Sequence, residues 1–192
     1  MTQDHDSQSA TTTDDRIIHA TISLISSHGL GAITMSQVAE DAGVARQTLY
    51  NHYRDIDSIV AVAIDRHNNE SVALLTSALT VAQTPTEKLG QMARHFAMVG
   101  AHAGQALQVG SATSSEVRHA LDTYKRAIEE LIHSVIEDGQ QTGDLRADLA
   151  PDTDAVLVRS ILDGIQELAA ATPERASDIA ASGARTLLAA VR

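Results

Sequence analysis

The chain has 192 residues, no cysteine, three prolines and one phenylalanine, and its formal net charge is -11. The absence of cysteine excludes disulfides and thiolate metal sites and favours an intracellular, here cytoplasmic, protein. Few prolines among many alanines and leucines favour an all-helical fold. No apolar run approaches the ~20 residues of a membrane helix, and the polar first residues do not resemble a secretory signal, so we expect no membrane partner.

The N-terminal segment changes character at residue 14. Residues 1–13 are polar without an apolar period, and we expect a disordered arm. Protein arms that reach into the minor groove of DNA usually carry Arg or Lys, and this segment carries neither. From Asp14 to His28, isoleucines recur at helical spacing, which predicts a helix capped by Thr13 or Asp14 and stopped by glycine.

Two short helical patterns then meet at a tight turn within residues 34–56. Gly43 supplies a residue that tolerates positive φ at the end of a helix, and a second helix is expected over residues 45–53. A short helix, a turn with glycine and a second helix at a steep angle predict a helix-turn-helix. In that motif the second helix enters the major groove of DNA. The first helix presents apolar residues at helical spacing, namely Met35, Val38, Ala39 and Ala42.

This stretch resembles the signature of the tetracycline-repressor (TetR) family of transcriptional regulators. The matching residues are Thr34, Ala39, Ala42, Gly43, Val44, Thr48, Leu49, Tyr50, His52 and Tyr53. The resemblance covers residues 14–60 and implies a three-helix DNA-binding domain. It also implies a dimeric bacterial repressor, nucleoid-associated when bound to a palindromic operator and released by a small-molecule effector.

Four polar residues on the predicted recognition helix are candidates for base contact. Arg46 can bind guanine O6 and N7 through two hydrogen bonds, and Gln47 or Asn51 can bind adenine N6 and N7. The resemblance places Arg46, Gln47 and Tyr50 nearest the bases. The alternatives are a solvated charge for Arg46 and a half-buried packing role for Tyr50.

Other residues of the motif are expected near the DNA backbone. Thr34 is the predicted cap of the first helix of the motif and could direct that helix's N-terminus at a phosphate. Ser36 lies one turn further and could also touch DNA. The resemblance places Thr48, Asn51 and His52 towards phosphates, with a structural role as the alternative for His52.

The charge of this region opposes DNA binding. Residues 14–60 contain six acidic residues and three arginines. Members of the resembled family often have Lys at the start of the fourth helix, and here Ile56 stands there between Asp55 and Asp57. Because phosphate attraction supplies non-specific affinity, we expect weak binding to random DNA and a strongly salt-sensitive complex. Arg54 or the helix amides would replace the missing anchor.

The remaining chain predicts a helical body over residues 61–192, for about nine helices in total. A long fourth helix, capped by Asp55 with Ser58, would join the body to the DNA-binding head and end before Pro85. A Gly- and Ser-rich stretch follows the next helix. Further helices are expected over residues 105–109, 115–139 and 152–171, and from Pro173 onward.

The body would bind the effector and hold the dimer together. Helical proteins bind ligands between helices, among apolar walls with a few polar groups. Our candidate lining residues are Met92, His95, Phe96, Val99, His102, Tyr124 and Ile128, and each could instead be ordinary core. No H-x-x-E or H-x-x-x-H pattern accompanies the two histidines, so we expect neither a metal site nor a cofactor.

The C-terminal helices and the protein as a whole each allow a second interpretation. The two C-terminal helices, about residues 152–191, are rich in small residues; the resemblance implies a four-helix bundle with a second subunit, and packing within one chain is the alternative. The whole protein could also be a ligand-binding or dimerisation module with a weakened DNA head. We do not expect an enzyme, because the sequence holds no phosphate-binding glycine loop, no G-x-S-x-G and no metal-ligand cluster.

Overall fold

The computed structural model describes residues 12–103 and 114–192, and within them the fold is all-helical, as predicted. These residues form two 3-10 turns, Leu30–Ala32 and Pro173–Arg175, and eight α-helices. The α-helices are α1 (Thr13–His28), α2 (Met35–Asp41), α3 (Arg46–His52), α4 (Ile56–Val81), α5 (Pro85–Ala103), α6 (Ser115–Thr142), α7 (Pro151–Ala171) and α8 (Ala176–Val191). The arm at residues 1–11 and the short helix expected at residues 105–109 lie outside the described residues.

Several helix ends differ from the predictions, and three of them have a clear local cause. The cap of α1 is Thr12, whose hydroxyl accepts a hydrogen bond from the amide of Asp15, so the helix starts one residue early. Helix α6 passes through Gly139, which is buried against Leu145, and ends only where Gly143 adopts a φ of 78°. Pro173 opens a 3-10 turn before α8 rather than α8 itself.

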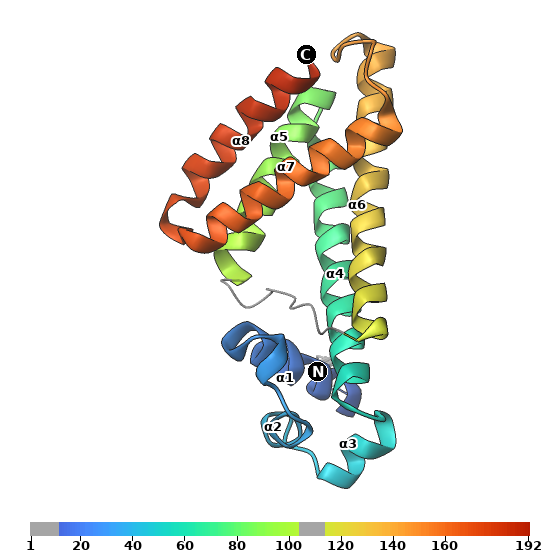
Figure 1. Cartoon of the computed structure of the whole chain (residues 1–192), viewed down its shortest axis with the longest axis vertical. Helices are drawn as coiled ribbons and strands as arrows, with labels where there is room; N and C mark the ends of the chain where they lie inside the picture. Colours follow the sequence, from blue (N-terminus) through green and yellow to red (C-terminus); the bar gives the residue numbers. More distant parts are fainter. Residues whose placement is uncertain (1–11, 104–113) are drawn as a thin grey trace, which may run out of the picture.

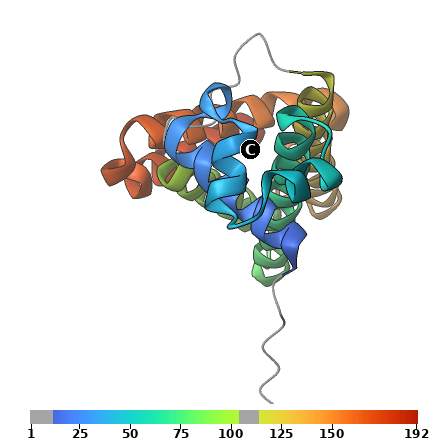
Figure 2. The ribbon, with the colours of Figure 1, turned by 90° about the horizontal axis from the view of Figure 1, so that it is seen from below.

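The molecule is elongated, with a small head of α1, α2 and α3 at one end (Figure 1). Helices α4 and α6 lie side by side along the long axis, α5 and α7 pack beside them, and α8 packs against α5 and α7. A view from the head end looks onto α2 and α3 with the body behind them (Figure 2). None of the helices in the described part of the chain is long and apolar enough to cross a lipid bilayer.

The buried residues form two separate clusters, one in the body and one in the head. The head cluster extends along α4 as far as Ile64 and also takes in Val117 and Ala120 of α6. The first turns of α6 therefore complete the hydrophobic core of the head. A displacement of α6 relative to α4 would disturb the packing that positions α2 and α3.

Candidate nucleic-acid interface

The turn between α2 and α3 depends on one glycine. Gly43 has a φ of 63°, a conformation that side chains with a Cβ rarely adopt. Its amide donates to the carbonyl of Glu40 at 3.1 Å, and the amide of Val44 donates to the carbonyl of Ala39 at 3.0 Å. These bonds close the end of α2 and set the direction in which α3 leaves.

Helix α3 has one buried face and one polar face. Leu49 is fully buried in the head core, whereas Arg46, Gln47 and Asn51 are exposed. Tyr50 keeps 54% of its surface exposed, so the packing alternative does not account for most of this side chain. The side-chain amide of Gln47 donates to Asn51 Oδ1 at 3.1 Å, which holds two candidate adenine readers together one turn apart.

The remaining candidates lie around this face. Thr34 is exposed and caps α2, as predicted: its hydroxyl accepts from the Gln37 amide, and Gln37 Oε1 accepts from the Thr34 amide at 2.9 Å. Ser36 and Thr48 are half-buried, and His52 is exposed at the end of α3. All eight predicted DNA-contacting residues thus belong to α2, α3 or the cap that opens α2.

A tyrosine at the end of α3 ties that helix to the start of α1. The Tyr53 hydroxyl donates to Asp14 Oδ1 at 2.5 Å, and His52 Nδ1 lies 3.8 Å from the same oxygen. Burial, together with this hydrogen bond and the carboxylate charge, raises the pKa of Tyr53 well above its usual value, so the phenol stays protonated. Beside it, Arg66 of α4 binds Asp15 Oδ1 at 2.6 Å, and hydrogen bonds from the Thr12 hydroxyl and then from Arg66 lower the Asp15 pKa to about 2.

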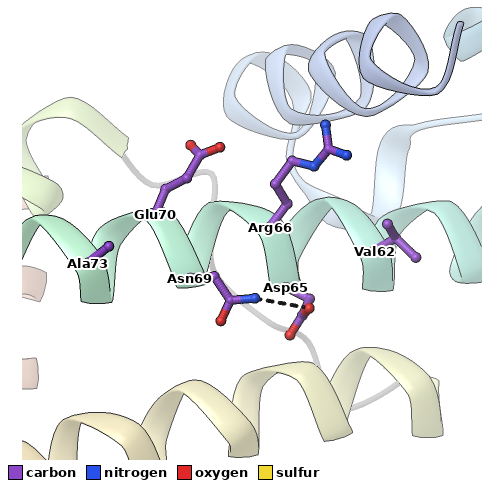
Figure 3. Close-up of a pocket in the computed structure, with 6 residues that line it drawn as sticks. All are labelled: Val62, Asp65, Arg66, Asn69, Glu70 and Ala73. Atoms are coloured by element: carbon purple, nitrogen blue, oxygen red, sulfur yellow. Dashed lines mark hydrogen bonds between the residues drawn. The ribbon is translucent and has the colours of Figure 1, made fainter. Parts of the chain in front are cut away.

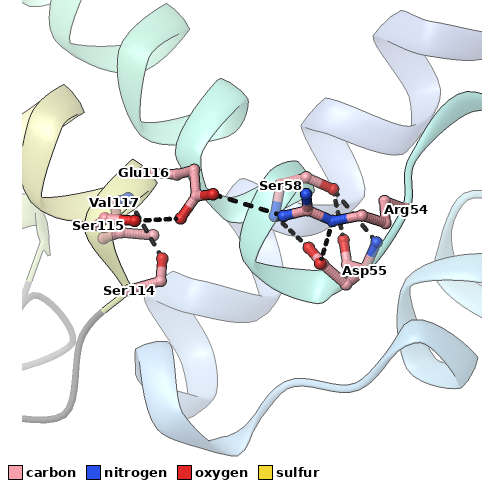
Figure 4. A network of polar contacts seen from close by, with 7 residues as sticks. All are labelled: Arg54, Asp55, Ser58, Ser114, Ser115, Glu116 and Val117. Atoms are coloured by element: carbon pink, nitrogen blue, oxygen red, sulfur yellow. Dashed lines mark hydrogen bonds and ion pairs between the residues drawn. The ribbon is translucent and has the colours of Figure 1, made fainter.

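Arg54, the arginine that follows α3, is held by carboxylates (Figure 4). Its Nε donates to Asp55 Oδ2 at 2.6 Å, and its Nη2 lies 3.4 Å from Glu116 Oε1 at the start of α6. Asp55 also accepts from the amide of Ser58 and so caps α4, as predicted. The Arg54 side chain lowers the pKa of Asp55, which keeps this carboxylate ionised. Arg54 therefore connects the head to α6 and shares its charge with two acids.

Comparison with known families identifies the head. Residues 17–63 match the family model described as bacterial regulatory proteins, tetR family. The N-terminal domain of this chain belongs to the tetR family. The match to this family model confirms the resemblance expected from the helix-turn-helix signature. No curated protein matches the sequence.

Solved structures of regulators share the fold along almost the whole length of this chain. A regulator FadR from Bacillus subtilis, in complex with stearoyl-CoA, has a TM-score of 0.78 at 17% identity, covering 92% of this chain and 98% of its own. A putative TetR-family regulator from Rhodococcus sp. has a TM-score of 0.77 at 20% identity, covering 92% of this chain and 98% of its own. A putative regulator from Saccharomonospora viridis, in complex with choline, has a TM-score of 0.77 at 16% identity, covering 93% of this chain and 96% of its own.

The seven candidate effector residues occupy different environments in the body. Met92, Phe96 and Ile128 are fully buried in the body core. His102 is exposed, and its Nδ1 lies 2.7 Å from the carbonyl oxygen of Met98, so it is held against its own helix. The half-buried candidates are His95, Val99 and Tyr124.

Two surface cavities of the body lie within the described part of the chain and are not lined by any candidate effector residue. One, of about 460 Å³, lies on α4 alone, where Asp65 and Asn69 are hydrogen bonded and Arg66 points towards α1 (Figure 3). The other, of about 390 Å³, lies between α6 and α7 around His133 and Asp152. Effector sites of helical proteins lie between helices, so the cavity on α4 alone is a poor candidate.

Proposed function

We propose that the protein is a ligand-responsive transcriptional regulator that binds a palindromic DNA operator as a homodimer. Its mode is repression, relieved when a small-molecule effector binds in the body. The observation that carries this proposal is the exposed polar face of α3, bearing Arg46, Gln47, Tyr50 and Asn51, on a tetR-family head. A dimer would place two such helices about 34–36 Å apart, one turn of DNA.

Each residue of the interface receives a role from its position. Arg46, Gln47 and Tyr50 read base edges, because they project from the first turns of the recognition helix. The phosphate contacts are assigned to Thr48, Asn51 and His52, and to Thr34 and Ser36 at the start of α2. Because the head carries few positive charges, base contacts rather than phosphate attraction would supply much of the preference for the operator over random DNA.

The dimer interface is assigned to α7 and α8, about residues 152–191. Helix α7 leaves three large apolar side chains substantially exposed in the single chain: Val156, Leu157 and Leu168. Helix α8 exposes small residues along much of its length, so a second copy can approach closely. Burying the apolar side chains against a partner would remove them from water, which favours association.

Replacing Leu157 by glutamate is expected to convert the dimer to a monomer and to weaken operator binding, because a charge would be buried at the interface. Leu74→Glu is the matched control, since Leu74 is a similarly exposed leucine on α4. Sedimentation velocity gives the mass of each variant, and fluorescence anisotropy gives its operator affinity. A Leu157→Glu protein that stays dimeric, or a wild-type protein that is monomeric while binding its operator, would contradict the assignment.

The second candidate function is a ligand-binding or dimerisation module with a weakened DNA head. The observations that favour it are the excess of acids over arginines in the head, Ile56 at the start of α4, and the capture of Arg54 by Asp55 and Glu116. The two candidates differ in one respect: only the regulator binds a specific DNA site.

The Arg54–Glu116 pair gives a measurable consequence for DNA binding. Glu116→Gln is expected to tighten operator binding by about two- to fivefold, because it removes a negative charge near the DNA and releases Arg54 from one carboxylate. The control is Glu130→Gln, the same change at an exposed position further along α6. Anisotropy titrations at several salt concentrations measure both. Equal tightening by both variants would mean that net charge, not Arg54, is responsible.

A further inference from the structure

A group of polar residues lies where four body helices meet. Ser71 of α4 is buried, and its hydroxyl lies 3.0 Å from His95 Nε2 of α5. Tyr124 of α6 is half-buried, and burial raises its pKa, so its phenol is neutral. Arg159 comes from α7 and is only 9% exposed. We call these four residues the polar cluster.

Arg159 is the charged member of the polar cluster and is incompletely paired. Its Nε and Nη2 both donate to Asp163 Oδ1, at 2.8 and 2.7 Å. Its guanidinium carbon lies 5.7 Å from the ring centre of Phe96 and 5.6 Å from that of Tyr124. Its Nη1 is buried and has no hydrogen-bond partner. A buried donor on a cation is costly to leave unmet, so this nitrogen has unused capacity to bind an acceptor.

The chemistry around Nη1 selects the kind of acceptor. A guanidinium offers its donors in a plane that matches a carboxylate. Asp163, whose side chain is 48% exposed, already balances the single charge of Arg159, so the free Nη1 donor suits a group that brings one further negative charge better than a dianion. Phe96, whose ring lies beside the guanidinium, is a fully buried apolar side chain, and Met92 and Ile128 are fully buried members of the same body core. The cluster is therefore suited to an acid with an apolar remainder.

We propose that the effector is a small organic carboxylate whose acid group binds Arg159 Nη1 while its apolar part lies against Phe96 and Tyr124. This inference rests on the proposed function of the body as an effector domain. It uses two of the candidate residues found from the sequence, Phe96 and Tyr124, and adds Arg159. The ligands of similar structures do not decide the matter, since one holds an acyl-CoA and another the cation choline.

Paired acids and amides test the proposal with the full-length protein in the absence of DNA. The probes are benzoate, 4-phenylbutyrate and octanoate, each beside its neutral amide. Thermal unfolding and isothermal titration are expected to show that at least one acid stabilises and binds the wild-type protein while its amide does not. Absence of any acid-over-amide preference in the wild-type protein would overturn the proposal.

Three variants separate ligand binding from a merely structural ion pair. Arg159→Met is expected to weaken binding of the preferred acid by about tenfold or more, because a charge-assisted hydrogen bond is lost. Arg159→Lys, which keeps the charge without the planar fork, should retain a weaker preference for the acid. Asp163→Asn should bind the acid at least as tightly as wild type, because a competing carboxylate is removed. If the Arg159–Asp163 pair were purely structural, these variants would lose stability without any change in their preference for the acid over its amide.

Two outcomes would reject the inference about Arg159. One is unchanged acid binding by folded Arg159→Met protein; the other is loss of acid binding in Asp163→Asn that equals the loss in Arg159→Met. Circular dichroism establishes folding, and Arg159→Lys stands in if Arg159→Met does not fold. Operator binding, measured separately, distinguishes this failure from failure of the proposed function, because the titrations contain no DNA.

Discussion

Arg46→Ala protein is expected to lose about 30- to 10⁴-fold in operator affinity, since each subunit loses a bidentate base contact of about 1–3 kcal/mol and the dimer loses two. Arg46 is exposed on α3, the helix whose opposite face holds Leu49 in the head core. The substitution therefore removes a reader of DNA without removing a packing residue. Anisotropy titration with a labelled operator measures the effect, and a scrambled duplex measures non-specific binding.

The control for Arg46 is Arg16→Ala. Arg16 is an exposed arginine of the same head, on α1, so the change in net charge is identical. Loss of one distant positive charge should weaken binding to the operator and to random DNA by similar, small factors, because the charge acts through phosphate attraction. If both variants lost affinity equally, Arg46 would act as a plain charge and the assignment of base reading would be wrong.

Gly100→Ala is expected to destabilise the body by about 1–3 kcal/mol, the usual cost of overpacking a well-packed core. A Cβ at this position of α5 would lie 2.2 Å from the carbonyl oxygen of Gln166 on α7. Because that atom belongs to the backbone of a helix, the two helices would have to separate. Urea unfolding followed by circular dichroism gives the change in unfolding free energy.

Gly90→Ala provides the matched comparison on the same helix. A Cβ at Gly90 meets no atom within 4 Å. Alanine is a better helix former than glycine, so this variant should gain up to about 1 kcal/mol. If the unfolding free energy of Gly100→Ala were no lower than that of Gly90→Ala, α5 and α7 would not cross as closely as described. It would also count against the polar cluster as described, because His95 and Arg159 come from those two helices.

Local signals in the sequence predicted the head well. The caps Thr34 and Asp55, the glycine turn and the exposed polar face of α3 depend on residues within a few positions of one another. Such interactions follow from spacing alone. The cap of α1 was misplaced because Thr12, Thr13 and Asp14 are all suitable capping residues, and only the geometry selects the one that pairs with Asp15.

Contacts between distant parts of the chain could not be predicted in this way. The Tyr53–Asp14 bond spans 39 positions and the Arg54–Glu116 pair spans 62. Only the fold brings these residues together. Arg159 was missed for the same reason, since an arginine on a predicted helix is ordinarily solvated and nothing local indicates two aromatic rings beside it.

In the body, apolar periodicity identified which residues face inward but not what they face. Met92, Phe96 and Ile128 are predicted effector contacts, and all three are fully buried. The same spacing produces a core residue or a residue beside a ligand, because both require an apolar side chain on the inner face of a helix. The distinction depends on the polar groups nearby, which belong to other helices.

The most direct test of the account is selection of bound fragments from the source genome by the purified protein, first at low and then at physiological salt. A dimeric regulator of this kind is expected to enrich a palindromic site with half-sites about one helical turn apart, and to lose that enrichment with Arg46→Ala. Genes beside the enriched site would then indicate which organic acids to test as effectors. Absence of enrichment even at low salt, or enrichment of DNA without two-fold symmetry, would contradict a dimeric DNA-binding regulator.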